Sequence, residues 1–242
     1  MLRDRFYGAI DDLYARIRET QNENISKTAA LVAETAARGG GIHVFDTGHI
    51  ISQELIGRAG GFVMYKQLKY AFTVDDAVRR RPAEDRETSM EGLSEYVLRK
   101  SNVLPGDLLF IGSVSGKTMN VIDLAITAKQ HGVKVVVITS IEYSSGLTTP
   151  HSSGLRLFEI GDVVLDNCTP PKDAMLEVEG LDAGLCPASG MAAAYIMWAV
   201  TAEACELMLN SGITPSVYMS HNCPEGPDFN VGIVKAYEQN GY

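Results

Sequence analysis

The clearest hydrophobic pattern of the chain runs from residue 107 to residue 140. A continuous apolar run at 108–111 leads into a turn rich in serine and glycine, and an amphipathic segment over 121–130 follows. After a glycine, a second apolar run covers 133–138. Continuously apolar runs of this length are typical of parallel strands that are buried on both faces. The segment therefore predicts a strand–helix–strand unit with a right-handed crossover.

The same kind of pattern predicts the other elements of an α/β fold. Residues 42–46 form the first predicted strand, 62–74 a strand and loop, 162–166 a fourth strand, and 174–178 a shorter fifth strand. Apolar residues at helical spacing predict helices over 50–56, 91–100, 187–210 and 229–238. Together these elements predict a doubly wound, mainly five-stranded parallel sheet flanked by helices.

The N-terminal segment carries two helical patterns, separated by the polar stretch 19–24. Because an amphipathic helix must bury its apolar side, the two patterns predict a helical hairpin that packs on the domain's own flank or on a second subunit. No long linker, repeat or low-complexity segment interrupts the chain. We therefore predict a single domain over 1–242, with the hairpin at 1–38, the α/β core at 39–210 and a tail loop and helix at 211–242.

Charge and composition narrow the range of partners. The chain has 242 residues and a formal net charge of −9, whereas a nucleic-acid-binding surface needs clustered positive charge. The first residues carry charges where a signal peptide would be apolar, and the longest apolar run, 191–200, is too short to cross a membrane. We therefore expect a cytoplasmic protein with no nucleic-acid or membrane partner. The four cysteines form no CxxC pair, so we expect no metal site and no cofactor.

The turn after the strand at 108–111 offers groups that bind anions. Ser113, Ser115, Gly116 and Thr118 place three hydroxyls and a glycine at a helix N-terminus. Unpaired backbone N–H groups and the helix dipole make such a position suitable for a phosphate or a sulfonate. The alternative is a capped turn without a ligand, because Ser and Thr are also good N-caps. The turn alone leaves both interpretations open.

A second turn lies at the same predicted edge of the sheet, where α/β folds place ligands. Gly48 and His49 follow the first strand and precede a helix that carries Glu54 and Arg58. The last two residues are spaced i, i+4, so the alternative to a functional pair is an ordinary surface ion pair. For His49 the alternative to a catalytic role is a helix cap or a histidine of a surface loop.

Residues 107–140 resemble the SIS (sugar isomerase) domain, whose signature is a strand, S-x-S-G-x-T/S, a helix and a strand that ends in T-S. The turn at 113–118 fills the first motif, and residues 139–140 fill its end. The pentapeptide ELIGR at 54–58 is similar to the E-L-T-G-R helix of the sedoheptulose 7-phosphate isomerases. The resemblance covers about residues 1–210, and the tail is similar to uncharacterised SIS proteins.

This resemblance implies a flavodoxin-like strand order and assigns roles by position. The Ser/Thr turn of the family holds the phosphate of the sugar, Glu54 matches a catalytic acid/base, and Arg58 matches a substrate contact. Together with the turn residues beside them, the expected substrate-binding set is Gly48, Ser52, Arg58, Ser113, Ser115, Gly116, Thr118, Thr139, Ser140 and His151.

The family's second acid/base is a histidine in the last long helix, which in this chain contains none. Sedoheptulose 7-phosphate chemistry therefore does not carry over directly. His49, His151 and His221 lie in predicted loops, which can meet at one edge of a sheet. We rank His49 and His221 as the replacement acid/base ahead of His151, and a neighbouring subunit often completes the site in this family. His43 and His131 are expected to be structural.

The pattern and the resemblance together lead to three hypotheses. The first is a metal-independent aldose–ketose isomerase for a sugar with a terminal phosphate or sulfonate, in which Glu54 and an imidazole, from His49 or His221, divide the proton transfers of an enediol mechanism. The second is a SIS protein that binds or senses a sugar phosphate without catalysis. The third is a lyase or etherase for an amino-sugar phosphate. A homodimer or homotetramer is expected.

Overall fold

The computed structural model describes residues 1–47, 51–75, 78–79 and 89–242. Five strands form one sheet in which every neighbouring pair is parallel, in the order β2-β1-β3-β4-β5. This confirms the predicted five-stranded parallel sheet and its flavodoxin-like order. The strands are β1 (Ile42–Asp46), β2 (Tyr65–Gln67), β3 (Leu108–Gly112), β4 (Lys134–Thr139) and β5 (Val163–Asp166).

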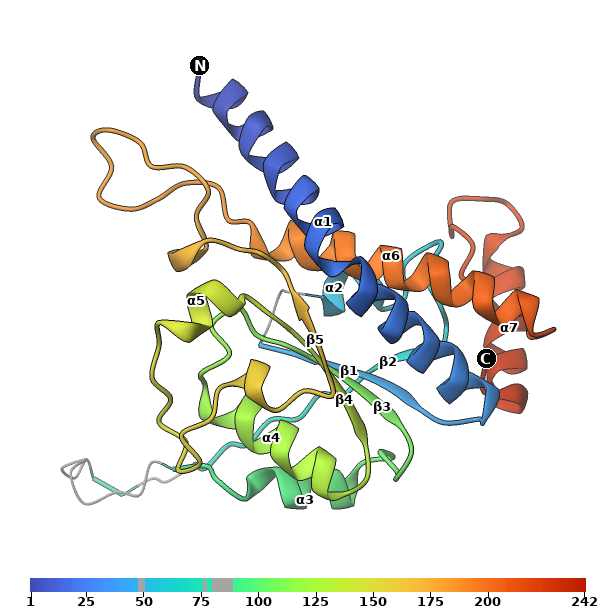
Figure 1. Cartoon of the computed structure of the whole chain (residues 1–242). Helices are drawn as coiled ribbons and strands as arrows, with labels where there is room; N and C mark the ends of the chain where they lie inside the picture. Colours follow the sequence, from blue (N-terminus) through green and yellow to red (C-terminus); the bar gives the residue numbers. More distant parts are fainter. Residues whose placement is uncertain (48–50, 76–77, 80–88) are drawn as a thin grey trace.

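Helices cover both faces of the sheet. They are α1 (Leu2–Ala37), α2 (Ser52–Leu55), α3 (Leu93–Lys100), α4 (Met119–Gln130), α5 (Ile141–Ser145), α6 (Ser189–Asn210) and α7 (Gly226–Asn240), with short 3₁₀ turns at Leu157–Glu159 and Pro171–Asp173. Figure 1 shows α1 and α6 on one side of the sheet and α3 and α4 on the other, as a doubly wound fold requires.

Alternate residues of the central strand β3 enter two separate hydrophobic cores. Leu108 and Phe110 join the core beneath α1 and α6, whereas Leu109 and Ile111 join the core on the side of α4. All four side chains are completely buried. The apolar run at 108–111 is therefore continuous because both faces of the sheet are covered, as the sequence predicts.

The predicted N-terminal hairpin is wrong, because α1 is a single helix of 36 residues. The polar stretch 19–24 contains neither proline nor glycine, so nothing in it forces the helix to end. Ile17, Gln21 and Ile25 continue one buried stripe through it at a spacing of four residues. The side-chain oxygen of Gln21 accepts a hydrogen bond from the backbone N–H of Asp166 at 3.0 Å. The polar stretch is thus part of the contact with β5.

The predicted fifth strand at 174–178 is also wrong. Within the described chain, this segment pairs only through an isolated bridge between Leu176 and Leu185 and does not join the sheet. The fifth strand is β2, which lies inside the predicted strand and loop at 62–74 and has only three residues. An edge strand of this length is too short for alternation to identify it.

Two predicted boundaries need smaller corrections. The helix expected over 50–56 is a single turn, α2, in the described residues. The hydroxyl-rich segment after β4, which we expected to be a loop, begins with the short helix α5. Ser140 caps that helix, because its hydroxyl oxygen accepts a hydrogen bond from the backbone N–H of Tyr143 at 3.1 Å.

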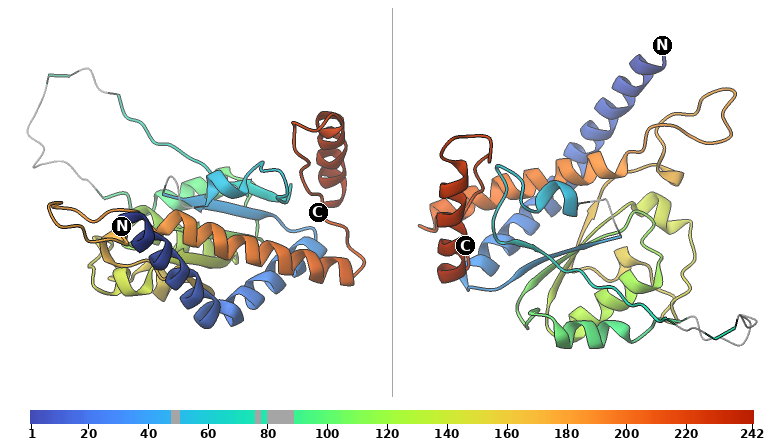
Figure 2. Two further views of the ribbon diagram at one scale, coloured as in Figure 1. Left: turned by 90° about the horizontal axis from the view of Figure 1, so that it is seen from above. Right: turned by 180° about the vertical axis from the view of Figure 1, so that it is seen from behind.

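The long apolar helix α6 forms much of the core above the sheet. Its buried residues include Ala192, Ile196 and Val200, and Tyr195 stacks on Tyr14 of α1 with the ring centroids 4.3 Å apart. Seen from above, α1 and α6 lie side by side across the sheet (Figure 2). Among the described helices, α6 alone has the length and apolar composition of a membrane span, properties that core helices share. The absence of a membrane partner stays a prediction.

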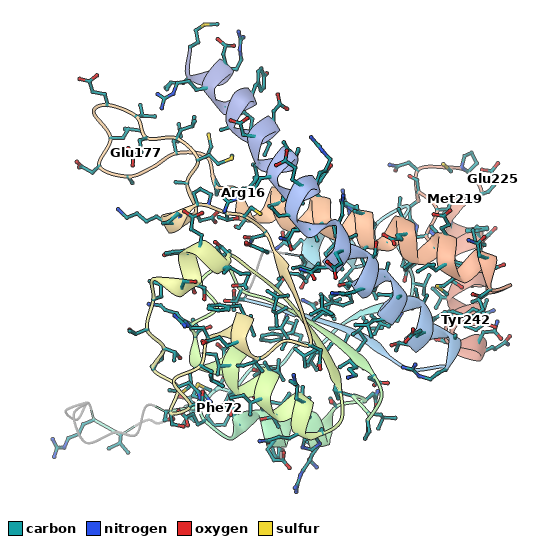
Figure 3. The ribbon with its side chains drawn as sticks, viewed as in Figure 1. Arg16, Phe72, Glu177, Met219, Glu225 and Tyr242 are labelled. Carbon is teal, nitrogen blue, oxygen red and sulfur yellow. The ribbon has the colours of Figure 1, made fainter. Side chains whose placement is uncertain are left out.

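Two segments project beyond the sheet at the same end of the molecule. Figures 1 and 3 show the first turns of α1 beside the loop that carries Glu177. Arg5 Nη2 donates a hydrogen bond to the carbonyl oxygen of Glu177 at 2.7 Å. Leu2 and Tyr7 in these turns are 44% and 54% exposed. The buried stripe of α1 begins only at Leu13.

The strand order creates a topological switch point between β1 and β3. From β1 the chain continues through α2 to β2 on one side, whereas from β3 it continues through α4 to β4 on the other. The connections after the two strands diverge, which opens a crevice at the carboxyl edge of the sheet. This crevice positions the candidate site.

Candidate functional site

A cavity of about 420 Å³ lies at the switch point. The ends of β1 and β2, the single turn of α2 and the first turn of α4 form its wall. Polar side chains dominate the lining. The lining residues are Phe45, Asp46, Thr47, Ser52, Gln53, Gln67, Leu68, Lys69, Tyr70 and Asn120.

Asp46 shapes one side of this cavity by capping α2. Its Oδ2 accepts hydrogen bonds from the backbone N–H groups of Ile51 and Ser52 at 2.8 and 2.7 Å. Ser52 is thereby held in the wall of the cavity, where the residue is only 6% exposed. Within the described part of the chain, this hydroxyl has no hydrogen-bond partner. A buried polar group left unpaired costs about 1–3 kcal/mol, so Ser52 favours a polar ligand or a water molecule in the cavity.

The Ser/Thr turn lies between β3 and α4, next to Asn120 of the cavity. The backbone N–H of Ser113 donates to the carbonyl oxygen of Ile138 at 3.0 Å, which ties the turn to the end of β4. Thr118 is the N-cap of α4, yet its side chain makes no capping hydrogen bond. Among the described residues, no side-chain hydrogen bond is formed by Ser113, Ser115 or Thr118. These free hydroxyls favour an anion site over a merely capped turn.

Gly116 is required by the shape of this turn. Its φ is +54°, a left-handed conformation that side chains rarely adopt. A Cβ at this position would lie 2.9 Å from Thr139 Oγ1 and 3.0 Å from Ser144 Oγ. The turn therefore packs closely on the end of β4, and Gly116 builds the site rather than offering a side chain to a ligand.

Thr139 and Ser140, which we expected to bind substrate, lie beneath the turn and are completely buried. The Thr139 hydroxyl donates to the carbonyl oxygen of Val114 at 3.1 Å. The Ser140 hydroxyl donates to the carbonyl oxygen of Thr169 at 2.6 Å. Neither residue lines the cavity. The backbone N–H of Ser140 also donates to the carbonyl oxygen of Val114 at 3.1 Å, so both residues hold the turn in place.

Glu54 and Arg58 lie beside the cavity without lining it in this conformation. Their side chains are 49% and 56% exposed, and Glu54 Oε2 lies 3.4 Å from Arg58 Nη2. This is the i, i+4 surface pair that the sequence left as the alternative. An exposed pair of this kind contributes only about 0–1 kcal/mol, so Glu54 can exchange this partner for another at little cost.

The two described histidines that we expected near the site, His151 and His221, lie outside the cavity. Gly48 and His49 are outside the described residues. His151 is buried on the side of α4, with Nδ1 2.9 Å from Ser153 Oγ and Nε2 3.9 Å from Asp123 Oδ1. His221 is exposed beside α7, in the tail that Figure 3 marks with Met219 and Glu225. The structure thus brings neither His151 nor His221 to the cavity.

The two histidines expected to be structural each contact a carboxylate away from the cavity. His43 Nε2 lies 3.0 Å from Asp107 Oδ2, and Asp107 also accepts the backbone N–H of Gly41. His131 Nε2 lies 2.6 Å from Glu95 Oε2, and this hydrogen bond lowers the pKa of Glu95. Both pairs connect neighbouring elements of the fold.

The sequence patterns did not single out several of the cavity residues. Gln67, Lys69 and Tyr70 come from the end of β2, and Asn120 comes from the first turn of α4. Burial, followed by the charge of Asp123, raises the pKa of Tyr70, so its phenol is neutral at ordinary pH. Their position in the sequence could have identified them, because each lies at the end of a strand, just after it, or in the first turn of a helix at the edge of the sheet where α/β folds bind ligands.

The described residues contain no cluster of side chains of the kind that binds a metal ion. No group of three or more His, Cys, Asp or Glu side chains there could hold a metal ion. Whether the chemistry is metal-independent, and whether any cofactor takes part, stays a prediction.

Comparison with known proteins gives consistent matches. The family model of the SIS domain matches residues 5–140, more than half of the chain. UPF0309 protein lmo0025 of Listeria monocytogenes serovar 1/2a is 35% identical over 230 residues, which cover 94% of this chain and 94% of the relative. UPF0309 protein OB3413 of Oceanobacillus iheyensis is 31% identical over 238 residues, 96% of this chain and 95% of the relative.

Solved structures of low sequence identity also match. The phosphoheptose isomerase GmhA of Neisseria gonorrhoeae has a TM-score of 0.49 at 15% identity, with coverage of 84% of this chain and 97% of that chain. A likeness at this level does not bear on activity.

Proposed function

Since the chain belongs to the SIS domain family and, within it, to the UPF0309 proteins, we propose that it isomerises an aldose and a ketose that carry a terminal phosphate or sulfonate. One observation carries the proposal: a polar cavity lies at the switch point, lined by Ser52, whose buried hydroxyl has no partner among the described residues, and by Asn120, two residues after the Ser/Thr turn. Cavities of this size suit small ligands, and this position is where α/β folds bind them.

The anion of the substrate occupies the start of α4 in this proposal. Ser113, Ser115 and Thr118 supply hydroxyl donors there, and the helix N-terminus adds backbone N–H groups and a positive potential. Asn120 lies in the first turn of α4 and also lines the cavity, so the sugar extends from the anion site past Asn120 toward Ser52. Binding at the far end holds the reacting carbons in place and lowers the entropic barrier.

Glu54 then acts as the base that moves the proton between C2 and C1. It directly follows Gln53 of the cavity wall, and its present ion pair with Arg58 is weak enough to break when substrate binds. The carboxylate removes the C2 proton, the electron pair of that bond forms the C1–C2 double bond, and the carbonyl oxygen becomes an enediolate oxygen. Return of the proton to C1 gives the other isomer. His49 and His221 stay candidates for transfer between the oxygens, the latter from a second copy in a homodimer or homotetramer.

Exchange of the C2 hydrogen with solvent tests the assignment. Glucose 6-phosphate, glucosamine 6-phosphate and ribose 5-phosphate are incubated with the protein in D₂O, and deuterium at C2 is followed by proton NMR. We expect Glu54→Gln to abolish exchange while the stabilisation of the fold by the sugar phosphate persists. Glu206→Gln, which removes an exposed carboxylate from α6, is the matched control. Exchange at the wild-type rate in Glu54→Gln removes Glu54 from the mechanism.

A second candidate function is binding of a sugar phosphate without catalysis. The observation that favours it is the surface ion pair of Glu54 with Arg58, together with the positions of His151 and His221 outside the cavity. The same experiment separates the two functions. A binder gains stability from the sugar phosphate but gives no C2 exchange, whereas an isomerase gives exchange and the isomeric product. Loss of a C3 substituent after exchange would instead identify a lyase.

A further inference from the structure

Lys69 is the one positively charged residue among the described residues that line the cavity. It follows β2 by two residues, at the carboxyl edge of the sheet, and its side chain is exposed to the cavity and to solvent. No ion pair joins its ammonium group to a carboxylate within the described chain. Lys66, three residues earlier, differs: its ammonium lies 4.4 Å from the ring centroid of Tyr237 in α7, outside the cavity.

In the proposed function the anion lies at the start of α4, beside Asn120, and Lys69 lines the cavity from a different connection. Asn120 belongs to the connection after β3, whereas Lys69 belongs to the connection after β2, and β1 lies between these strands. Neighbouring strands are about 4.8 Å apart, so the two connections are separated by about 10 Å. That separation is comparable to the length of an open-chain sugar phosphate. A sugar whose anion binds at α4 therefore presents its carbonyl end to Lys69.

The other polar groups of the cavity cannot supply a positive charge there. Asp46 is a carboxylate that already accepts two backbone N–H groups, and Tyr70 is a neutral phenol. Ser52 offers a neutral hydroxyl donor, and Gln67 a neutral amide. Charge that develops on a carbonyl oxygen during proton removal at C2 is stabilised best by a preorganised cation at that oxygen.

We propose that Lys69 is a catalytic residue that binds the carbonyl oxygen of the sugar and stabilises the enediolate, an inference that rests on the proposed function. As Glu54 removes the C2 proton, the electron pair moves into the C1–C2 double bond and the carbonyl π electrons move onto oxygen. The ammonium group of Lys69 donates a hydrogen bond to this oxygen throughout. After a proton has moved from O2 to O1, its return to C1 from Glu54 turns the C1–C2 double bond into the C2 carbonyl, and Lys69 is left in its starting protonation state. Lys69 thus stabilises the negative charge on the oxygen, and α6 contains no histidine that could do so.

The test measures binding of two probes by isothermal titration calorimetry. Inorganic phosphate reports the anion site alone, and arabinonohydroxamate 5-phosphate adds two adjacent oxygens that mimic an enediolate. We expect Lys69→Met to weaken hydroxamate binding roughly 10- to 100-fold, as for loss of a hydrogen bond to a charged group, and phosphate binding less than about 2-fold. Lys66→Met is the matched control and should change neither. Lys69→Arg keeps the charge and should recover part of the hydroxamate affinity.

Three outcomes would overturn the inference, and they are distinguishable. Equal weakening of both probes in Lys69→Met places the lysine at the anion instead of the carbonyl oxygen. Unchanged hydroxamate affinity makes it a solvated surface lysine and leaves the proposed function intact. A wild-type protein that binds neither probe removes the proposed function for sugar phosphates, and the role of Lys69 in it.

Discussion

Replacement of Gly116 by alanine tests how the Ser/Thr turn is built. Alanine would adopt φ near +54° and place its Cβ 2.9 Å from Thr139 Oγ1 and 3.0 Å from Ser144 Oγ. The left-handed conformation costs about 1–2 kcal/mol, and overpacking adds about 1–3 kcal/mol. Alanine also restricts the unfolded chain more than glycine does, and this effect offsets about 0.4–1 kcal/mol of the destabilisation. We expect the free energy of unfolding to fall by about 3 kcal/mol in total.

Gly154→Ala is the matched control, because Gly154 has φ +68° but no neighbouring atom within 4 Å of the point where a Cβ would lie. It suffers the conformational strain alone, about 1 kcal/mol after the same offset. Urea unfolding of both variants should therefore show a difference of about 2 kcal/mol with unchanged m-values, or about 4–8 °C in melting temperature for a chain of this size. Phosphate should still stabilise Gly154→Ala but not Gly116→Ala. Equal destabilisation of the two would refute the packing argument.

Two further predictions concern contacts that hold the frame of the site. Gln21→Ala leaves the backbone N–H of Asp166 without its acceptor and should lower the free energy of unfolding, measured in urea, by about 1–3 kcal/mol. The control Glu19→Ala, on the exposed side of α1, should change it by less than about 0.5 kcal/mol. Similar effects of the two substitutions would contradict the role of Gln21. The hydrogen bond with His131 lowers the pKa of Glu95 in the folded protein. The ionised Glu95 therefore stabilises the fold at pH values above its unfolded pKa of about 4.3, and this stabilisation is lost as the pH falls through the lower pKa of the folded state. Glu95→Gln should therefore melt below the wild type at about pH 6 and together with it at about pH 3; a gap that persists in acid would exclude this linkage.

The parts of the fold that the sequence predicted are those with their own local signal. β3 and the residues of β4 after Lys134 are continuously buried because the sheet is covered on both faces, and the turn at 113–118 carries its motif within six residues. Gln21 misled the interpretation of α1, since its polarity indicates exposure while its actual partner is a backbone N–H in β5, far away in sequence. No local pattern reports such a partner.

The cavity was only half predictable for a related reason. The Ser/Thr turn is itself a motif and Ser52 lies two residues before ELIGR, whereas Lys69 enters the site because the three-residue strand β2 pairs with β1 and ends at the same edge. A strand that short is specified by its partner rather than by its own alternation. The apolar segment around Leu176 is the opposite case. It has the composition of a strand, but within the described chain its only strand-like pairing is a single bridge to Leu185, so it does not join the sheet.

The unbroken course of α1 has a mechanical consequence. At 1.5 Å per residue, its 36 residues follow a helical path of about 54 Å, and the view from above shows that the two halves run in different directions (Figure 2). A hairpin could fold back and shelter its own apolar tip, but in a continuous helix the first turns lead away from the buried stripe and leave Leu2 and Tyr7 exposed. A surface that covers these side chains must therefore come from elsewhere than the helix itself.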